Sequence, residues 1–438
     1  MDLKETCDIN IFKNKDIPIN LSKEILDIPE SGFKEFETSK KVYASFKKLG
    51  ITDIKSSIAR TGIKAKLSTG KPGPKIAIIG ELDALSVPGH PYENKNSNAA
   101  HACGHHIQIG NIFAVLIGLF DKKILNKLCG EIIFFAVPAE EFVEIEWRNS
   151  LREKKEIEFL SGKQEMIKLG SFDEIDIAIM THATPREIKF SYGGSNNGLV
   201  AKFIEFTGKA SHAGVSPEKG INALNAANVA LSAINSQRET FKDEDHIRVH
   251  PIITKGGSVV SAVPDSVKME TFVRGANIDA IIDANNKVDR CLKAGALATG
   301  SKVNITTIAG YLPIKNDKNL LEVYKKNLLC NFSSNEIIEN QHIGGSTDMG
   351  DLSNLVPSIH PYVGGSTGNS LHAKDLVVEN YDLSVIDAGR MMAHTVIDLL
   401  ENDASVANDV INNFNPNFTK ENYLKFLRGL MKKEEFEF

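Results

Sequence analysis

The stretch GEIIFFAVPAEE (residues 130–141) decides the fold, because an unbroken apolar run gives way to proline and two acids. PKIAIIGELDAL (74–85) and EIDIAIMTHATP (174–185) have the same form, and they end in acids and in a histidine. Continuous apolar strands are typical of a parallel sheet buried on both faces. IQIGNIFAVLIGLF (107–120) is apolar on most sides and too long for a strand, which indicates a buried helix. We therefore expect an α/β domain with a mostly parallel sheet covered by helices.

A second pattern begins near residue 194. LVAKFIEFTG (199–208) alternates apolar and polar residues, as a half-exposed strand does, and an alanine-rich amphipathic helix is expected over 222–237. Two more strands are expected before residue 276. The charged tail, 408–438, is expected to be partly helical with a solvated end. The predicted organisation is an inserted α+β lid or dimerisation domain at 194–309 and a discontinuous first domain made of 1–193 and 310–438.

Composition excludes several classes of protein. The chain has 438 residues, 42% hydrophobic and 24% charged, so it is long enough for two globular domains. A net charge of −5 does not favour a nucleic-acid partner, and the apolar stretches are too interrupted to span a membrane. The N-terminal residues do not resemble a secretory signal, and the five cysteines have no framework spacing. These features indicate reduced thiols and a cytoplasmic location.

Ligand-type side chains follow the predicted strands at their carboxyl ends. In open parallel sheets, ligands bind outside these ends. HACGHH (101–106) follows the first strand and offers a thiolate and imidazoles, with Gly104 allowing a sharp turn. The residues at the strand ends are Glu81, Asp83, Glu140, Glu141 and His182. Their convergence with Cys103 and His105 predicts a metal site.

Simpler interpretations exist for each residue. A single cysteine is usually a small core residue, and adjacent acids often stand at an exposed helix N-terminus. A sharper alternative makes Cys103 a nucleophile with His105 as its base. That interpretation leaves Glu140, Glu141 and His182 without a function, so the metal site is preferred.

Several motifs, taken together and in order, resemble the M20 metallopeptidases. The most similar group is the amidohydrolase branch, with aminoacylase-like enzymes, auxin-conjugate hydrolases and aminobenzoyl-glutamate hydrolases. The resemblance runs from about residue 20 to residue 400. The motifs are GELDAL, HACGHH, VPAEE, THATP, KASHAGVSPEKGINALNAA, VPDSVKMETFVRG, GGSTDMGDLSNLVP and LHAKDL.

The resemblance implies a centre of two divalent metal ions and a set of site residues. The implied ligands are Cys103, His105, Glu141, His182 and His372. Glu140 would be the general base, and His212 on the lid of the same chain or of a partner subunit would stabilise the oxyanion. Arg274 and the loop residues Gly345, Ser346 and Thr347 would hold the substrate. Asp83 is expected to accept a hydrogen bond from a ligating histidine, because such a histidine usually has an acceptor for its second ring nitrogen.

The expected reaction is metal-dependent hydrolysis of an amide bond in an N-acyl amino acid, an aryl-amide conjugate or a dipeptide-like small molecule. Glu140 would take the proton from the attacking water. The donor set favours zinc or manganese and leaves cobalt and nickel open. A homodimer formed through the lid is also expected. The alternative from a different class is a non-catalytic dimeric metal-binding scaffold, which would not need Glu140.

The sequence departs from the branch in three places. His106 stands where the branch usually has an aspartate, and Ser261 stands where an asparagine is usual. The charged insertion after Glu141, which includes residues 151–165, is longer than usual and forms either a surface segment or part of the access to the site. None of these departures removes an implied ligand or the base.

Overall fold

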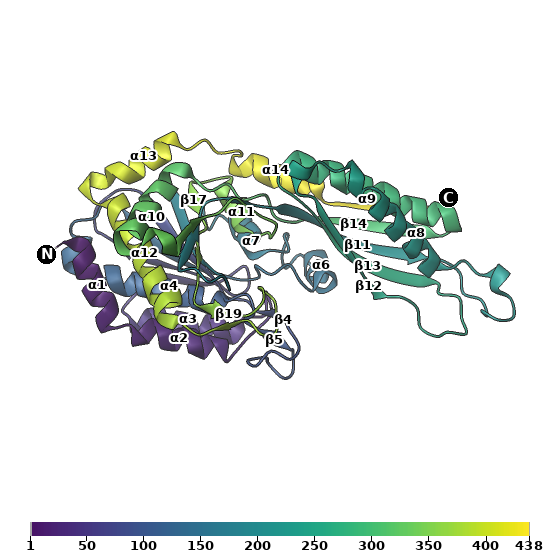
Figure 1. Cartoon of the computed structure of the whole chain (residues 1–438), viewed down its shortest axis with the longest axis horizontal. Helices are drawn as coiled ribbons and strands as arrows, with labels where there is room; N and C mark the ends of the chain where they lie inside the picture. Colours follow the sequence, from purple (N-terminus) through teal and green to yellow (C-terminus); the bar gives the residue numbers. More distant parts are fainter. Residues whose placement is uncertain (1, 438) are drawn as a thin grey trace.

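Two parts lie end to end in the computed structural model, which describes residues 2–437 (Figure 1). The larger part contains the central sheet and most helices, and we call it the catalytic part. The smaller part is an elongated sheet with helices on one side, and we call it the lid. Met1 and Phe438, the two ends of the predicted first domain, lie outside the described residues.

The central sheet confirms the expected α/β architecture. Its strand order is β1-β2-β6-β3-β7-β17, and β6, β3, β7 and β17 run parallel while β1 and β2 are antiparallel additions. The parallel strands are buried on both faces, which explains their continuous apolar sequences. The bounds are β1 (Ile54–Ile58), β2 (Gly62–Ser68), β3 (Lys75–Glu81), β6 (Glu131–Val137), β7 (Ile177–Met180) and β17 (Ser358–Ile359).

Helices cover both faces of this sheet. One hydrophobic cluster joins the first face to α1 (Leu3–Lys13), α2 (Asp16–Leu26), α3 (Phe36–Lys48), α4 (His105–Leu119), α5 (Lys122–Leu125), α10 (Lys318–Asn331), α12 (Ala388–Leu400) and α13 (Ser405–Asn413). A π-helical turn, η5 (Asp382–Asp387), leads into α12. The opposite face packs on α6 (Ile145–Glu153), α7 (Gly162–Lys168), α11 (Met349–Ser353) and α14 (Lys420–Leu430). The buried helix predicted over 107–120 is α4, with all but one residue buried.

Small sheets shape the edge where the parallel strands end. β8 (His182–Ala183) belongs to a four-stranded sheet with β9 (Phe190–Tyr192), β15 (Ile337–Glu339) and β18 (Tyr362–Val363). Three further pairs complete this region. They are β4 (Leu85–Ser86) with β5 (Ala99–Ala100), β10 (Ser195–Asn196) with β16 (His342–Ile343), and β19 (Ser366–Thr367) with β20 (Val377–Val378).

The lid is an antiparallel sheet in the order β12-β13-β11-β14-β21, with two helices on one face. The half-exposed strand expected over 199–208 is β11, which alternates between buried and exposed residues only in its second half, since residues 198–202 are all buried. Its neighbour β13 alternates strictly between buried and half-exposed residues. The bounds are β11 (Gly198–Thr207), α8 (Ala223–Ser236), β12 (Arg248–Lys255), β13 (Ser266–Gly275), α9 (Ile278–Thr299), β14 (Lys302–Ala309) and β21 (Lys432–Phe436).

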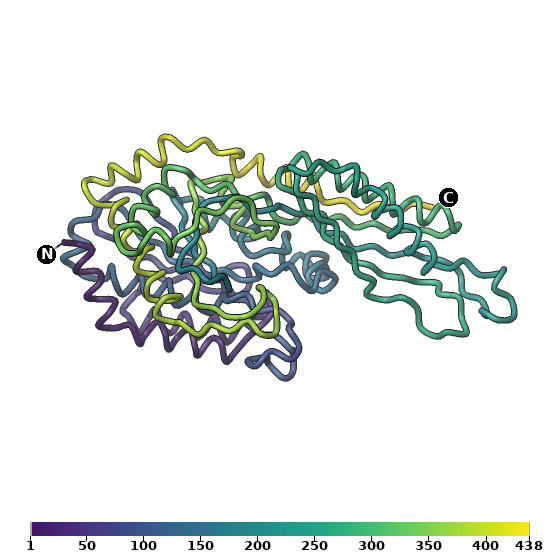
Figure 2. The backbone as a smooth tube through the Cα atoms, in the orientation of Figure 1, coloured from purple at the N-terminus to yellow at the C-terminus, as the bar shows by residue number. Residues whose placement is uncertain are grey.

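The structure adds to two sequence expectations. The charged tail is partly helical and its end is largely exposed, as expected, but that end is also a strand, β21, which pairs with β14 of the lid sheet and not with the first domain. Figure 2 shows the chain leaving the catalytic part and ending on the lid, far from the N-terminus. The reason is that β14 offers an open edge for β21, while Phe436 packs on the lid core. The charged insertion is not only a surface segment, because Phe159, Leu160 and Lys163 are fully buried.

Across residues 2–437, we find no helix that combines the length and the apolar character needed to cross a bilayer. The five cysteines are all free thiols.

Candidate metal centre

Strand endings place the carboxylates of the site. β3 ends at Glu81 and β6 at Val137, and the two strands are parallel neighbours, so the residues that follow share one edge. After Pro138, Ala139 adopts a positive φ of 52°, which breaks the strand alternation. Glu140 and Glu141 can therefore both line the same cavity.

The turn before α4 places the thiol and the first imidazole. Gly104 has φ of 83° and caps the helix that begins at His105. A Cβ atom at Gly104 would lie 2.5 Å from the Cβ of Ala183, so only glycine fits this turn without a shift. The turn lets Cys103 and His105 point to the same place.

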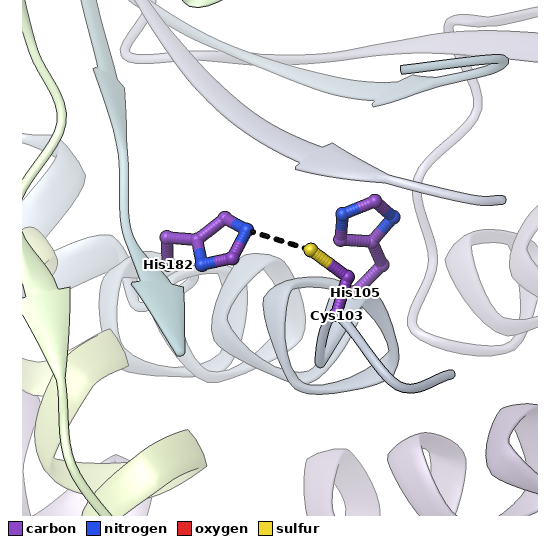
Figure 3. Close-up of side chains that lie close together, drawn as sticks. All are labelled: Cys103, His105 and His182. Atoms are coloured by element: carbon purple, nitrogen blue, oxygen red, sulfur yellow. Dashed lines mark hydrogen bonds between the residues drawn. The ribbon is translucent and has the colours of Figure 1, made fainter. Parts of the chain in front are cut away.

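Cys103 lies at the centre of the predicted ligands. Its Sγ is 3.4 Å from Nε2 of His182 and 3.3 Å from Nε2 of His372. His372 Nε2 is in turn 3.1 Å from Oε1 of Glu141. In Figure 3 the sulfur points toward His182, and the ring of His105 lies on the other side of the sulfur. The structure thus brings together all five residues that the resemblance implied as ligands.

Two overlapping donor sets share the thiol. One set is Cys103, His105 and His182, and the other is Cys103, Glu141 and His372. Within each set the ligand atoms lie within 4.8 Å of one another. The thiolate of Cys103 could therefore serve as a donor in either set.

Hydrogen bonding tests whether these residues fit metal ions. The Nδ1 of His105 is 2.8 Å from the main-chain oxygen of Asp83, so Nδ1–H donates and the lone pair is on Nε2. Among the described residues, neither His105 Nε2 nor Glu141 Oε1 has a hydrogen-bond partner, although both atoms are buried. His182 Nδ1 likewise faces the carbonyl of Ala183 at 2.8 Å, which directs Nε2 toward Cys103. Buried N and O atoms without hydrogen-bond partners, gathered around one thiol, fit a pair of divalent ions.

The electrostatics favour ionised ligands. Burial and Glu141 oppose ionisation of Cys103, but His182, His105 and His372 outweigh them and lower the thiol pKa to about 6. Glu141 raises the pKa of His372 to about 11 against the effect of burial. Burial also opposes ionisation of Glu141, but the His372 imidazole lowers the carboxyl pKa to about 2. A thiolate and a carboxylate are thus stabilised in the same place.

Glu140 differs from its neighbour Glu141. Burial, Glu81 and Glu141 raise the pKa of Glu140 well above its usual value. Its Oε2 lies 3.9 Å from His105 Nε2, and it belongs to neither set that includes Cys103. Glu140 is therefore a carboxyl group beside the donor sets with a high proton affinity, which suits proton transfer.

A cavity of about 380 Å³ opens onto these residues. Arg274 of β13 and the predicted loop residues Gly345, Ser346 and Thr347 line it. The guanidinium of Arg274 donates a 2.7 Å hydrogen bond to Oγ of Ser346, which joins the lid to the loop. His372 stands at the rim with 48% of its side chain exposed.

His212 is the predicted residue that this single chain does not bring to the site. It is exposed on the lid, and its Nδ1 accepts hydrogen bonds from the main-chain N–H groups of Gly214 and Val215. It is not among the residues that line the cavity. Asp83 is placed as expected, since its carbonyl oxygen accepts from His105 and its carboxylate accepts from the N–H of Glu141.

Sequence reasoning assigned no role to four residues near the site. Glu81 was expected there only as an acid at a strand end, and its Oε2 lies 3.2 Å from His105 Nε2. Lys163 contacts Glu81, and Asp348 contacts Lys163. His360 lines the cavity and is buried. The sequence gives no periodic or motif signal for Lys163, because it lies within the charged insertion.

Comparison with known proteins places the chain in context. A family model described as the peptidase dimerisation domain of M20 enzymes matches residues 195–300. The mouse (Mus musculus) Xaa-Arg dipeptidase is 29% identical over 66% of this chain, and the human (Homo sapiens) one 28% over 68%. The chain spans 62% and 63% of the lengths of these two relatives. One subunit of the p-aminobenzoyl-glutamate hydrolase of Escherichia coli is 32% identical over 50% of this chain and 48% of its own length.

Solved structures share the fold. A dinuclear metal-binding peptidase of the M20 family from Bacillus subtilis superposes with a TM-score of 0.63, covering 87% of this chain and 97% of that one at 19% identity. An aminobenzoyl-glutamate utilization protein from Klebsiella pneumoniae gives a TM-score of 0.65, covering 91% and 98% at 16% identity. At these identities the likeness establishes the two-part architecture alone.

Proposed function

We propose that this chain is a metal-dependent amidohydrolase of the M20 type, and its similarity to a peptidase dimerisation domain and to several amide-cleaving enzymes supports this proposal. The observation that carries the proposal is the shared position of Cys103 in two donor sets, with Glu140 beside them at one cavity. Zinc or manganese suits the mixed thiolate, imidazole and carboxylate donors best, with cobalt or nickel as further choices.

The residues divide the chemistry between them. Bound divalent ions would acidify a water molecule and polarise the amide carbonyl. Glu140 would take a proton from the attacking water and pass it to the leaving nitrogen, because its carboxylate lies beside the donor sets and belongs to neither group that contains Cys103. Cys103, His105, His182, Glu141 and His372 serve as the ligands.

The cavity lining favours an apolar substrate with a free carboxylate. Arg274 offers a cation to such a carboxylate, and Ser346 already orients its guanidinium. Glu140 and Glu141 are the only acids among the residues that line the cavity, so a cationic substrate group has no separate partner there. The apolar lining consists mainly of Leu85, Phe142, Leu199, Phe272 and Leu371. Among N-acyl amino acids, aryl-amide conjugates and dipeptides, those with apolar groups fit best.

We propose that a second copy of the chain supplies His212. Exposed apolar residues surround it on the lid, including Val215 (78% exposed) and Val260 (100% exposed), and they would be covered in a dimer. The match of residues 195–300 to a dimerisation domain supports the same arrangement. His212 would then stabilise the developing oxyanion, an effect typically worth about 3 kcal/mol.

Complementation between two inactive variants tests this arrangement. In a mixed dimer of Glu140→Ala and His212→Ala chains, one site retains its own Glu140 and receives an intact His212 from the partner. Mixing the two inactive proteins should therefore restore activity. Continued inactivity of the mixed dimers would contradict a role for His212 across the interface.

The catalytic proposal is tested with a panel of N-acyl amino acids, aryl-amide conjugates and dipeptides, assayed with zinc, manganese or cobalt by release of amine. Glu140→Ala should retain its metal and lose turnover by about 10²- to 10⁴-fold. Glu144→Ala is the matched control, because this carboxylate follows the same strand but pairs with Lys34 at the surface. Full activity of Glu140→Ala would refute the assignment of the base.

Two other functions are less well supported. A non-catalytic scaffold would bind metal yet show no turnover on the panel, and it gives no reason for a buried Glu140 beside the ligands. A Cys103 nucleophile needs one imidazole as base, whereas three imidazoles and Glu141 surround this thiol. Inhibition by metal removal, with recovery on adding metal back, separates the metal-dependent enzyme from the nucleophilic one.

A further inference from the structure

A fully buried lysine connects three segments that meet at the site. Lys163 has no exposed side-chain surface, and neither do its two carboxylate partners. Its Nζ is 2.5 Å from Oε1 of Glu81 and 2.5 Å from Oδ1 of Asp348. Glu81 ends β3, Asp348 follows the GGST loop, and Lys163 comes from the insertion, so the cation holds these segments together.

The backbone of the insertion is fixed as firmly as the ammonium group. Oδ2 of Asp348 accepts hydrogen bonds from Oγ of Ser161 (2.6 Å) and from the N–H of Lys163 (3.0 Å). A Cβ atom on Gly162 would lie 1.6 Å from the carbonyl oxygen of Pro138, so only glycine allows this close approach to the end of β6. The position of Lys163 is therefore determined independently of Glu81.

The second oxygen of Glu81 faces the candidate centre. Oε2 accepts a 3.0 Å hydrogen bond from Nε2 of Gln108 and lies 3.2 Å from Nε2 of His105. Since His105 donates through Nδ1, its Nε2 lone pair and this carboxylate oxygen face each other, an arrangement that a shared cation stabilises. Glu81, His105 and Glu140 also form a group whose ligand atoms lie within 4.8 Å of one another.

We propose that Lys163 is a positioning residue for the metal centre. Its ammonium group holds Oε1 of Glu81, so that Oε2 faces His105 and would face an ion bound there. This role rests on the proposed metal centre. Without the lysine, Glu81 and Asp348 would be two buried carboxylates that have lost their shared ammonium partner, and Glu81 would take up a proton or turn away.

Zinc titration of the metal-free protein, followed by calorimetry, tests the proposal without any substrate. In Lys163→Met, one of the two ions should bind about 10- to 100-fold more weakly, as is typical when a partner behind a ligand is removed. The other ion, held by Cys103, Glu141 and His372, should bind as in the wild type.

A matched control comes from the lid. Lys202 is also fully buried, and its Nζ is 2.5 Å from Asp289, so Lys202→Met loses an equivalent ion pair far from the site. The Lys202→Met variant should bind both ions with wild-type affinity.

Glu81→Gln keeps Lys163 and the size of the side chain, and it should weaken binding of the same ion as Lys163→Met does. If Lys163→Met does not fold, Glu81→Gln alone tests the proposal.

The outcomes separate this role from the proposed function. Two ions of wild-type affinity in Lys163→Met, or in Glu81→Gln, would overturn the role of Lys163. A wild-type protein that takes up no zinc would overturn the metal centre and this role together. A wild-type protein that binds two ions but hydrolyses nothing would overturn only the catalytic proposal.

Discussion

The catalytic part and the lid differ in how their buried charged side chains are paired. Both contain a fully buried lysine, Lys163 at the end of the central sheet and Lys202 within β11 of the lid. Lys202 is satisfied locally, since Asp289 and Thr307 accept its hydrogen bonds. Lys163 instead belongs to a group of buried carboxylates and imidazoles in which His105 and Glu141 retain unpartnered atoms.

That contrast distinguishes a structural ion pair from a functional one. The pair in the lid contributes to the order of that sheet, because each oxygen of Asp289 faces an ammonium group, that of Lys202 or that of Lys432. The group at the strand ends includes buried polar atoms without hydrogen-bond partners, which is unfavourable for the free energy of folding. An ion between these atoms would explain why they are buried there. Substitutions at the open group should therefore alter metal binding and activity, whereas those in the lid should mainly alter substrate binding or stability.

The largest effect is expected for His372→Ala. This change removes the partner of both Cys103 and Glu141, so one ion should be lost and turnover should fall by more than about 100-fold. Metal content after dialysis and hydrolysis of the best panel substrate are the measurements. His250→Ala, an exposed histidine on β12, serves as the control, and equal metal content in both variants would contradict the ligand assignment.

Arg274→Met should come next. The methionine keeps much of the packing over Phe272, whose ring lies 5.2 Å from the guanidinium carbon, but it removes the cation. For a substrate with a free carboxylate, KM should rise by roughly 10- to 100-fold with a smaller change in kcat. When the carboxylate of that substrate is amidated, its KM should differ little between Arg274→Met and the wild type. A similar rise for the amidated substrate would argue against a carboxylate contact.

Glu35 also tests this comparison, because it is a buried carboxyl group whose hydrogen-bond donors are all neutral. Burial, followed by Asp83, raises its pKa from 4.5 to about 7, while Thr61 and the N–H of Ala139 donate to it. The folded state therefore holds the proton more tightly than the unfolded state. The stability from this group is fully present below pH 4.5 and is lost as the pH rises through 7.

The expected loss from Glu35 is on the order of 2 kcal/mol between about pH 5 and about pH 7.5. Glu35→Gln should remove this part of the pH dependence, measured as the difference in unfolding free energy between the two pH values. Identical pH dependence in the variant and the wild type would show that Glu35 ionises normally.

Removal of residues 432–438 should have the smallest effect. The lid would lose β21, the ion pair of Lys432 with Asp289 (2.9 Å) and that of Lys293 with Glu434. We expect a loss of about 1–2 kcal/mol in unfolding free energy, since one edge strand is removed from an otherwise complete sheet. Metal content should not change. A truncated protein that loses its metal would indicate that the tail supports the site as well as the lid.

Much of the fold follows from local patterns in the sequence. Continuous apolar runs identified β3, β6 and β7, and alternation identified β11 of the lid, although only the second half of that strand is half-exposed. The helix α9 was missed, although it has 22 residues, and so was the strand character of the tail. The sequence of β21 is that of a charged, solvated segment. Its strand conformation depends on pairing with β14, which lies far earlier in the chain, so no local pattern predicts it.

The candidate site was also largely predictable. Ligand-type residues at the ends of parallel strands predicted that Cys103, Glu141 and His182 would meet, and the structure brings them together. Their roles as ligands, like the dimer and the cytoplasmic location, stay predictions. His212 lies away from the site in one chain, because its predicted role depends on a second copy.

The sequence by itself determined which strands are buried and which polar residues stand at their ends, since both follow from residue order along one segment. Only the tertiary structure decided which atoms there lack partners, and that Lys163 from a charged insertion lies between Glu81 and Asp348. The physical reason is that desolvation and pairing depend on neighbours in space, and these neighbours come from segments far apart in the chain.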